Sequence, residues 1–342
     1  MNAVRIYARR GVSIRLARRF SGPIFHCLSV LYISVLDSCM LAANDLKRTI
    51  ILVGASGYIG SRLSHEFKLR RWSILGCDLR NPAEPGNFSD FYLGSYTDLP
   101  DNFIENCDAV LWFAGHSSVR LAEADRWGSL ENNVFDLAKF LQRVDRLGKP
   151  IVYASSASVL STSKDSYSLV ADEVRANAYD AGKLAFDIIA PHCHRNAVAL
   201  RMATVCGWSP HMRWDIVFNA MNQSAANEKV VRVVNASNFR SLLFFEDLST
   251  YLVNHIEKLA NGDSQKPAQV VLGSWSGTIG LLAAEIADFW HVPIAFGQDT
   301  GTYSFVLNDR ALRSSYENPS TFYRSVGQCC ALFAQQNDWM AP

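Results

Sequence analysis

The stretch that decides the fold runs from Thr49 to Gly60 and reads TIILVGASGYIG. Its first half, residues 49–53, is a β-branched and apolar run typical of a buried strand, and residues 61–70 then carry a helical pattern. Gly54 allows a tight turn, Gly57 lets the backbone approach a pyrophosphate, and Gly60 permits close packing of the helix on the strand. The helix N-terminus would then face the phosphates. This pattern predicts the strand, turn and helix that open a dinucleotide-binding domain.

A second strand is expected downstream, over residues 73–77, and it ends at Asp78. An acidic side chain at this place can accept hydrogen bonds from the ribose hydroxyls of the adenosine, which favours NAD over NADP. Arg80 argues for the opposite preference, because a guanidinium just beyond the strand could hold a 2′-phosphate. NAD is therefore the expected cofactor and NADP the alternative.

Further strands and helices alternate along the chain. Residues 108–114 read as a buried strand that ends beside Gly115, and residues 130–147 carry helical periodicity. Alternation of strands and helices implies a parallel sheet and an α/β fold.

Side chains suited to proton transfer follow the next expected strand, residues 151–154. This strand opens into the serines of residues 155–158, and a helix is expected to begin near Tyr179 and to carry Lys183. Residues at this spacing share one face of a helix. An ammonium group beside the phenol favours the phenolate, so Tyr179 can exchange a proton with a substrate hydroxyl. A serine hydroxyl from the edge of the sheet can hold the same oxygen.

Composition and charge exclude several classes of protein. The 342 residues are 49% hydrophobic and 19% charged, with a net charge of +1. Because nucleic-acid binding requires a basic surface, we expect no nucleic-acid partner. The eight Cys residues include no Cys-x-x-Cys pair, so we expect neither a metal site nor a disulfide framework. Reduced thiols fit a cytoplasmic protein.

Residues 1–47 differ from the rest of the chain. Arginines at positions 5, 9, 10, 15, 18 and 19 precede an apolar run over residues 24–36. This run is shorter than the roughly 20 residues that span a bilayer. Three interpretations stay open: a start codon upstream of a true beginning at Met40, an organelle-targeting leader, and a membrane anchor. We exclude residues 1–47 from the fold and expect no membrane association of the folded domain.

Together these landmarks resemble the extended short-chain dehydrogenase/reductase superfamily, specifically its NAD-dependent epimerase/dehydratase family and most closely the relatives of UDP-glucose 4-epimerase. The resemblance covers about residues 49–312 and is carried by GASGYIG from Gly54, Asp78, FAG from Phe113, Asn133, SSAS from Ser155, YDAGK from Tyr179 and LRMATVCG from Leu200. It implies a Rossmann-type doubly wound parallel sheet in residues 48–205. A smaller substrate-binding lobe is implied in residues 206–342, with some segments returning to the sheet.

The resemblance also implies an enzyme with defined site residues. Tyr179 is implied as the acid/base, Lys183 as its modulator and a ligand of the nicotinamide ribose, and Ser156 as the hydroxyl that positions the substrate oxygen. Asn219 and Arg240 fall where relatives bind a sugar-nucleotide diphosphate. Residues implied to contact the cofactor are Gly54, Ser56, Gly57, Tyr58, Ile59, Gly60, Asp78, Phe113, Ala114, Gly115, Asn133, Tyr179 and Lys183. Dimers are common among relatives, so we expect a homodimer.

The expected reaction is NAD-dependent epimerisation of a nucleotide sugar, in which a hydride passes to the nicotinamide and returns to the opposite face of the same carbon. An NAD(P)H-dependent ketoreductase would use the same catalytic residues and is the alternative, whereas a non-enzymatic NAD-binding protein would not need them. Related dehydratases place Asp or Glu directly after the catalytic Ser or Thr. Ala157 and Ser158 occupy these positions here, so we expect no loss of water.

The substrate-side arginine of relatives is not evident near residues 297–299. Arg310 or Arg313 could replace it.

Overall fold

The computed structural model describes residues 5–7, 13–15, 48–160, 177–260, 269–300, 304, 307 and 325–339. The chain divides into two compact units, Met1–Lys47 and Arg48–Pro342. In the first unit, β1 (Arg5–Tyr7) pairs antiparallel with β2 (Ser13–Arg15). Arg310 and Arg313 lie outside the described residues. Among the helices that are described, none combines the length and the apolar character needed to cross a membrane.

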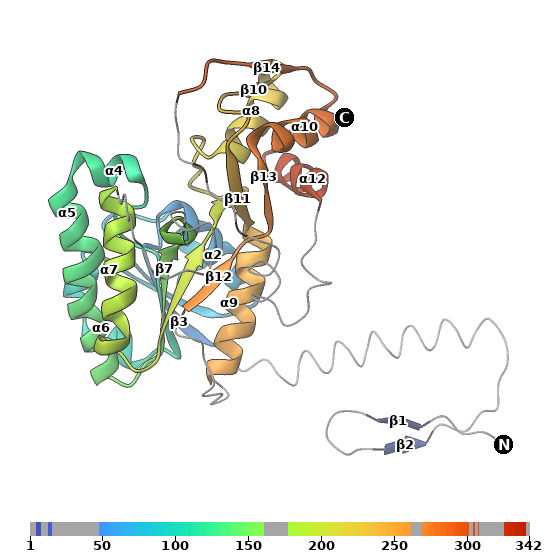
Figure 1. The fold of residues 1–342 in the computed structure, drawn as a ribbon. Helices are drawn as coiled ribbons and strands as arrows, with labels where there is room; N and C mark the ends of the chain where they lie inside the picture. The colour runs from blue at the N-terminus through green and yellow to red at the C-terminus, as the bar shows by residue number, and fades with distance from the viewer. Residues whose placement is uncertain are drawn as a thin grey trace. The chain divides into compact units, whose positions relative to one another are not determined.

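A seven-stranded parallel sheet is the centre of the second unit (Figure 1). In spatial order its strands are β5 (Asp90–Leu93), β4 (Ser73–Asp78), β3 (Thr49–Val53), β6 (Ala109–Trp112), β7 (Ile151–Ser156), β8 (Ala197–Met202) and β12 (Gln269–Leu272). From β3 the chain builds outward through β4 and β5, and then in the other direction through β6, β7 and β8. The direction reverses between β3 and β6, which is where such sheets bind ligands. The predicted α/β fold with a doubly wound parallel sheet is confirmed.

Helices cover both faces of this sheet. They are α2 (Tyr58–Leu69) and α9 (Phe245–Ala260) on one face, and α6 (Leu137–Arg146) and α7 (Ala178–Cys193) on the other. Because side chains alternate along a strand, Ile50 of β3 packs in the core shared with α2, whereas Ile51 packs in the core shared with α7. This alternation explains why the strand reads as a continuous apolar run.

A smaller lobe lies at the top of Figure 1. It contains a three-stranded sheet in the order β13, β11, β9 and a parallel pair of β10 with β14. The bounds of its elements are β9 (Thr204–Cys206), α8 (Val217–Glu228), β10 (Val231–Val233), β11 (Phe239–Phe244), β13 (Trp275–Thr278), α10 (Ile279–Trp290), β14 (Ile294–Phe296) and α12 (Val326–Gln336). The chain returns from this lobe to the large sheet, where β12 pairs with β8.

Short helical elements are also present among the described residues of the second unit. They are η1 (Pro85–Asn87), η2 (Tyr96–Asp98), α3 (Asp101–Glu105), α4 (Val119–Ala124), α5 (Arg126–Leu130), the π-helical turn η3 (Glu131–Asp136) and the 3₁₀ turn η4 (Ala157–Leu160).

Two element boundaries differ from the sequence-based expectation. The helix expected from Ser61 begins at Tyr58, because Gly57 adopts the extended backbone of an N-cap, with φ −76° and ψ 174°. The helix expected over residues 130–147 is interrupted by η3, whose wider turn contains the buried Asn133. Helical periodicity alone does not register such a turn, because most of the side chains stay on the same face.

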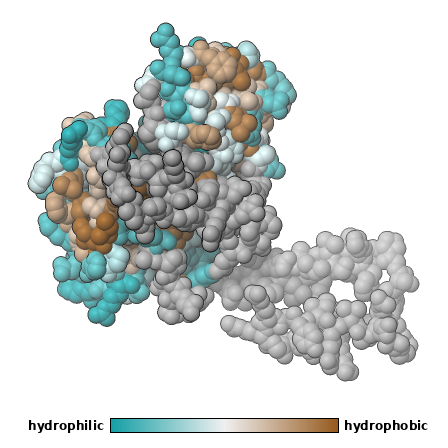
Figure 2. All heavy atoms as spheres, viewed as in Figure 1, coloured by the Kyte–Doolittle hydropathy of each residue, from teal (hydrophilic) through white to brown (hydrophobic). Residues whose placement is uncertain are grey.

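Apolar side chains are exposed on the helices at the left of Figure 2. Trp127 of α5 is 69% exposed, Phe135 of η3 46% and Ile188 of α7 62%. Large apolar residues gathered on one face are typical of interaction surfaces.

The segment from Gly54 to Gly60, called the glycine turn below, is closely packed, and this packing leads to a stability prediction. A Cβ atom added at Gly60 would lie 2.1 Å from the carbonyl oxygen of Gly54 and 2.8 Å from Cα of Ala55. Because both contacts are with backbone, we expect Gly60→Ala to lower the free energy of unfolding by about 1–3 kcal/mol, as overpacking does. Urea unfolding measures this change.

Gly86→Ala is the matched control, since a Cβ there meets nothing within 4 Å. Helix propensity alone predicts that Gly60→Ala stabilises the protein by about 1 kcal/mol. We expect the unfolding midpoint of Gly86→Ala to stay near that of the wild type. A midpoint of Gly60→Ala at or above the wild-type value would contradict the packing argument.

Candidate active site

The glycine turn after β3 touches the loop after β6. Gly54 has a φ of +83°, which favours glycine, and a Cβ atom there would lie 2.7 Å from backbone atoms of Phe113 and Ala114. The amide of Phe113 also donates to the carbonyl of Val53, at 2.8 Å. Three of the residues predicted to bind the cofactor, Gly54, Phe113 and Ala114, are thus brought together where the strand order reverses.

Asp78, the last residue of β4, holds the glycine turn. Its Oδ2 accepts from the amide of Ser56 at 2.9 Å, and its Oδ1 accepts from the amide of Arg80 at 3.1 Å. The Ser56 hydroxyl donates in turn to the carbonyl of Arg80, at 2.7 Å. The Arg80 side chain is 60% exposed and its Nε lies 3.9 Å from Asp78 Oδ1. The structure therefore brings Asp78 to the turn, as the sequence predicts, and keeps Arg80 at its rim.

The first turn of α2 has the character of an anion site. Its N-cap, Gly57, has no side chain, so no side-chain hydrogen bond caps the helix. The amide groups at the start of a helix attract phosphate groups. Ile59 and Gly60 belong to the same turn.

Asn133 clamps the loop that follows β6. Its Oδ1 accepts from the amide of His116 at 3.1 Å, and its Nδ2 donates to the carbonyl of His116 at 3.2 Å. Gly115, with a φ of +98°, lies so close that an added Cβ would be 2.2 Å from Asn133 Oδ1. Asn133 itself is fully buried. Its direct contact with a cofactor stays a prediction. In the structure Asn133 holds the backbone of the loop at His116.

Ser156, Tyr179 and Lys183 belong to β7 and to the first turns of α7. Nζ of Lys183 donates to the carbonyl of Ala154 at 2.7 Å and lies 5.9 Å from the ring centroid of Tyr179 and 5.0 Å from that of Trp112. Burial lowers the pKa of Lys183 to about 8, and the charge of Asp187 opposes this effect. The ammonium form therefore still predominates at neutral pH beside the Tyr179 ring.

A buried ion pair fixes α7 against the sheet. Oδ2 of Asp187 accepts from Nε of Arg201 on β8 at 2.7 Å and from the hydroxyl of Ser155 at 2.9 Å. Oδ1 accepts from the hydroxyl of Tyr153 at 3.1 Å. The side chains of Asp187 and Arg201 are 0% and 4% exposed. Since Asp187 lies one helical turn beyond Lys183, this network sets the position of Lys183 against β7.

A chain of hydroxyls and a carboxyl ends at Ser156, and sequence reasoning missed it. The hydroxyl oxygens of Ser156 and Ser158 lie 2.7 Å apart, and the Ser158 hydroxyl donates to Oδ1 of Asp180. Oδ2 of Asp180 accepts from Nδ2 of Asn177, the N-cap of α7, at 2.7 Å. The sequence signal was present, because Asn177 followed by Asp180 has the spacing of a helix N-terminus.

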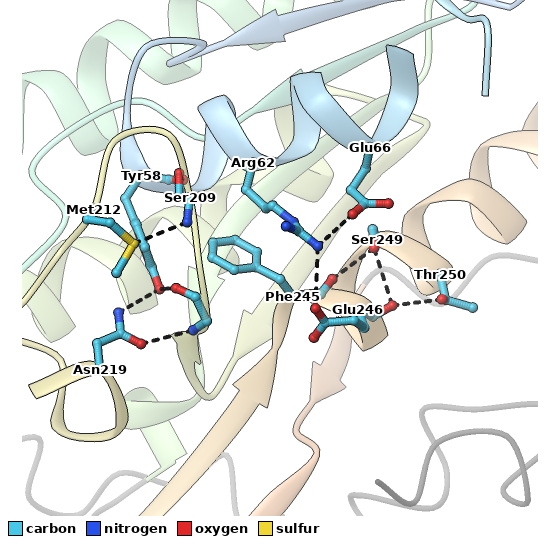
Figure 3. Close-up of polar contacts among 11 residues, drawn as sticks. Tyr58, Arg62, Glu66, Ser209, Met212, Asn219, Phe245, Glu246, Ser249 and Thr250 are labelled. Atoms are coloured by element: carbon cyan, nitrogen blue, oxygen red, sulfur yellow. Dashed lines mark hydrogen bonds and ion pairs between the residues drawn. The ribbon is translucent and has the colours of Figure 1, made fainter. Parts of the chain in front are cut away.

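The predicted substrate residue Asn219 joins the smaller lobe to the glycine turn (Figure 3). Its Nδ2 donates to the Tyr58 hydroxyl and to the carbonyl of Arg213, each at 2.9 Å, and its Oδ1 accepts from the amide of Gly207 at 3.0 Å. Tyr58 donates to the carbonyl of Gly207 at 2.7 Å, and burial raises the pKa of this phenol, which keeps it neutral. Asn219 is fully buried, and both its donor hydrogens are used within the protein. Its contact with a substrate stays a prediction.

Arg240, the other predicted substrate residue, lies on β11 opposite Gly277 of β13. It is 8% exposed and its Nη1 donates to the carbonyl of Phe239 at 2.8 Å. Its role toward a diphosphate likewise stays a prediction.

Arg213, whose carbonyl accepts from Asn219 Nδ2 at 2.9 Å, is a charged residue that the sequence did not single out. It pairs with Asp215 through two hydrogen bonds, of 3.0 and 2.7 Å. The bond to Asp215 raises the pKa of Arg213, and burial opposes this effect. No local motif surrounds Arg213, so only the fold reveals its contact with Asn219.

The fold and the site define a nucleotide-binding α/β protein of the Rossmann type. Residues 50–273, more than half of the chain, match the family described as the NAD dependent epimerase/dehydratase family, and the chain belongs to that family. The predicted family is thereby confirmed. A comparison with the curated proteins found no match.

Solved structures share this fold at low sequence identity. UDP-glucose-4-epimerase from Stenotrophomonas maltophila, with bound NAD and formylated UDP-arabinopyranose, is 17% identical, with a TM-score of 0.69 over 85% of this chain and 98% of that chain. TunA, an NAD dependent NDP-hexosamine 5,6-dehydratase involved in tunicamycin biosynthesis, is 18% identical, with a TM-score of 0.69 and the same coverage of 85% and 98%. UDP-N-acetylglucosamine 4-epimerase from Methanobrevibacter ruminantium M1 is 15% identical, with a TM-score of 0.69 over 85% and 99% of the two chains.

The buried ion pair yields a second stability prediction. Asp187→Ala would leave Arg201 charged and buried without its partner, so we expect the free energy of unfolding to fall by about 3–5 kcal/mol. Chemical unfolding of the purified variant measures this loss. Asp136→Ala is the control, since its partner Lys139 is 78% exposed and such surface pairs contribute about 0–1 kcal/mol. Equal effects of the two substitutions would refute the structural role of Asp187.

Proposed function

We propose that the protein is an NAD-dependent epimerase that inverts one hydroxyl-bearing carbon of a nucleotide sugar. The observation that carries the proposal is the arrangement at the end of β7, where the Lys183 ammonium is held by the carbonyl of Ala154 beside the Tyr179 ring. Family membership supports it, as does the similarity in fold to two nucleotide-sugar epimerases.

The residues at the strand-order reversal fit NAD. The uncapped first turn of α2 suits its pyrophosphate, and the Asp78 carboxylate at the end of β4 suits its ribose hydroxyls. When bound, the nicotinamide accepts a hydride from the sugar carbon and returns it. The contacts assigned to Ser56, Tyr58, Ile59, Gly115 and Asn133 are part of this proposal.

Tyr179, Lys183 and Ser156 would transfer the proton and bind the substrate oxygen. Tyr179 takes the proton of the sugar hydroxyl and later returns it. Lys183 keeps the phenolate accessible through its positive charge, which the pKa of about 8 preserves at neutral pH. Ser156 holds the sugar oxygen, and Asn219 and Arg240 would serve the diphosphate side.

The proposal also includes a homodimer. The exposed Trp127, Phe135 and Ile188 offer an apolar face on α5, η3 and α7. A second copy of the chain would cover this face.

Epimerisation is tested against dehydration by incubating UDP-, GDP- and dTDP-sugars with the enzyme in D₂O and examining the products by mass spectrometry and NMR. Inversion at a single carbon returns the same hydride, so we expect no deuterium on carbon and, after the hydroxyl deuterons are exchanged back in H₂O, products of unchanged mass. No acidic residue directly follows Ser156, but the structure brings the Asp180 carboxyl within one hydroxyl of it. A product lighter by one water, or labelled at C5, would refute the assignment.

The acid/base role leads to a mutational prediction. We expect Tyr179→Phe to reduce kcat by roughly 10² to 10⁴, because loss of a positioned acid/base has this effect, while folding and cofactor affinity stay near those of the wild type. Lys183→Ala should impair both turnover and cofactor affinity. Steady-state kinetics with a cofactor titration measures these effects. Full activity of Tyr179→Phe would show that another group handles the proton.

Cofactor preference gives a further prediction. We expect tighter binding of NAD than of NADP, because the Asp78 carboxylate repels a 2′-phosphate and accepts from a free ribose hydroxyl. Asp78→Ala should narrow this preference by about tenfold, the size of one hydrogen bond to a charged group. Calorimetric titration of both cofactors measures it, with Arg80→Ala as the comparison. Equal or tighter binding of NADP by the wild type would contradict the prediction.

A further inference from the structure

A short chain of hydrogen bonds connects Ser156, at the end of β7, to the first turn of α7. The hydroxyls of Ser156 and Ser158 lie 2.7 Å apart, and the geometry leaves open which of them donates. The Ser158 hydroxyl donates to Oδ1 of Asp180, and the Ser158 amide reaches Ser156 Oγ at 3.3 Å. Ser158 is 6% exposed, so its hydroxyl has little access to water.

Counting protons settles the direction of the chain when Asp180 is ionised. A carboxylate only accepts hydrogen bonds, and a serine hydroxyl has one proton to donate. The Ser158 hydroxyl therefore donates its proton to Asp180, and the Ser156 hydroxyl donates its proton to Ser158. In this state Ser156 can offer only its lone pairs to a substrate oxygen.

Protonation of Asp180 reverses the direction. Asn177 Oδ1 accepts from the amide of Asp180 at 2.9 Å, which orients the Asn177 amide so that its Nδ2 donates to Asp180 Oδ2. Oδ2 is thus occupied by a donor, and an added proton is favoured on Oδ1, where it faces Ser158. Asp180 then donates to Ser158, Ser158 donates to Ser156, and the Ser156 proton is free for a substrate oxygen.

We propose that Asp180 is a positioning residue that acts through Ser158 and decides whether the Ser156 hydroxyl donates or accepts at the substrate oxygen. The inference rests on the function proposed above for Ser156. A ketone or alkoxide oxygen requires a donor, so the protonated state of Asp180 is the one that supports the transfer of hydride to and from the sugar carbon.

The surroundings of Asp180 bring its protonated state closer to neutral pH. Burial raises the pKa of this carboxyl, and the hydrogen bonds from Ser158 and Asn177 oppose the effect. Among the described residues, the other ionisable groups near the start of α7 are Glu123 of α4, which accepts from the amide of Ala178 at 2.7 Å, Arg126 of α5, which pairs with Glu123, and Tyr179 and Lys183 of α7 itself. The elements β7 and η4 contribute the serine hydroxyls.

The first experiment measures the hydrogen bond without any reaction. The carboxyl carbon of Asp180 is titrated by NMR in ¹³C-Asp-labelled protein, assigned with Asp180→Asn, in the wild type and in Ser158→Ala. Because Ser158 donates to the ionised carboxyl, its loss should raise the pKa of Asp180 by about one unit. Ser158→Thr keeps a hydroxyl and should leave this pKa near its wild-type value. A pKa that is unchanged or lower in Ser158→Ala would overturn the inference.

The second experiment compares the pH dependence of kcat in the wild type, Asp180→Asn, Ser158→Ala and Ser158→Thr. As pH rises through the pKa of Asp180, Ser156 changes from donor to acceptor, so the wild-type rate should fall by about three- to tenfold, the value of one hydrogen bond. In Asp180→Asn the amide nitrogen faces Ser158 and donates at every pH, and in Ser158→Ala the Ser156 proton is free. Both variants should lack this fall, and Ser158→Thr should keep it.

A fall of the same size and midpoint in Asp180→Asn would overturn the proposal, because the ionisation would then belong to another group. The two experiments also separate this inference from the proposed function. Should no nucleotide sugar be turned over, the epimerase assignment fails, while the carboxyl titration still decides whether Asp180 controls the serine pair.

Discussion

The arrangement at the end of β7 depends on one buried charge, the carboxylate of Asp187. It holds Arg201 on β8 through a 2.7 Å ion pair and accepts from Ser155 and Tyr153 on β7. A helix that carries this carboxylate can dock on the sheet in one rotation only, since any other would leave a buried charge without its partner. Tyr179 and Lys183 lie on the preceding turns of the same helix, so their positions against Ser156 follow from this constraint.

A second set of contacts connects the nucleotide-binding sheet to the smaller lobe. Tyr58, in the first turn of α2, is linked by hydrogen bonds to Gly207 and Asn219. On the same helix the buried Arg62 forms ion pairs with Glu66 at 2.6 Å and with Glu246 of α9 at 3.4 Å (Figure 3). The start of α2 is therefore held from both sides, and a turn that is held in this way would lose little entropy on binding the phosphates of the proposed cofactor.

The network around Ser156 depends on two residues outside the Tyr179–Lys183 pair. The chain of hydroxyls needs Ser158, two residues beyond Ser156, and Asp180, the residue next to Tyr179. Neither belongs to the pair of aromatic and basic residues that identifies the helix. We expect substitution at either position to alter the direction of a hydrogen bond, and the N-cap Asn177 holds the Asp180 side chain in place.

The alternation of strands and helices from β3 to α7, the glycine turn, Asp78 and the spacing of Tyr179 and Lys183 were determined by the sequence alone, because each depends on local periodicity or on residues within one or two turns. The partners of these groups were decided by the tertiary structure. Asp180 meets Ser158 across 22 positions of sequence, and Asn219 meets Tyr58 across 161. Such contacts require the strand order and the rotation of each helix about its axis. Both are set by the packing of all the core side chains together, and no local pattern in the chain records that packing.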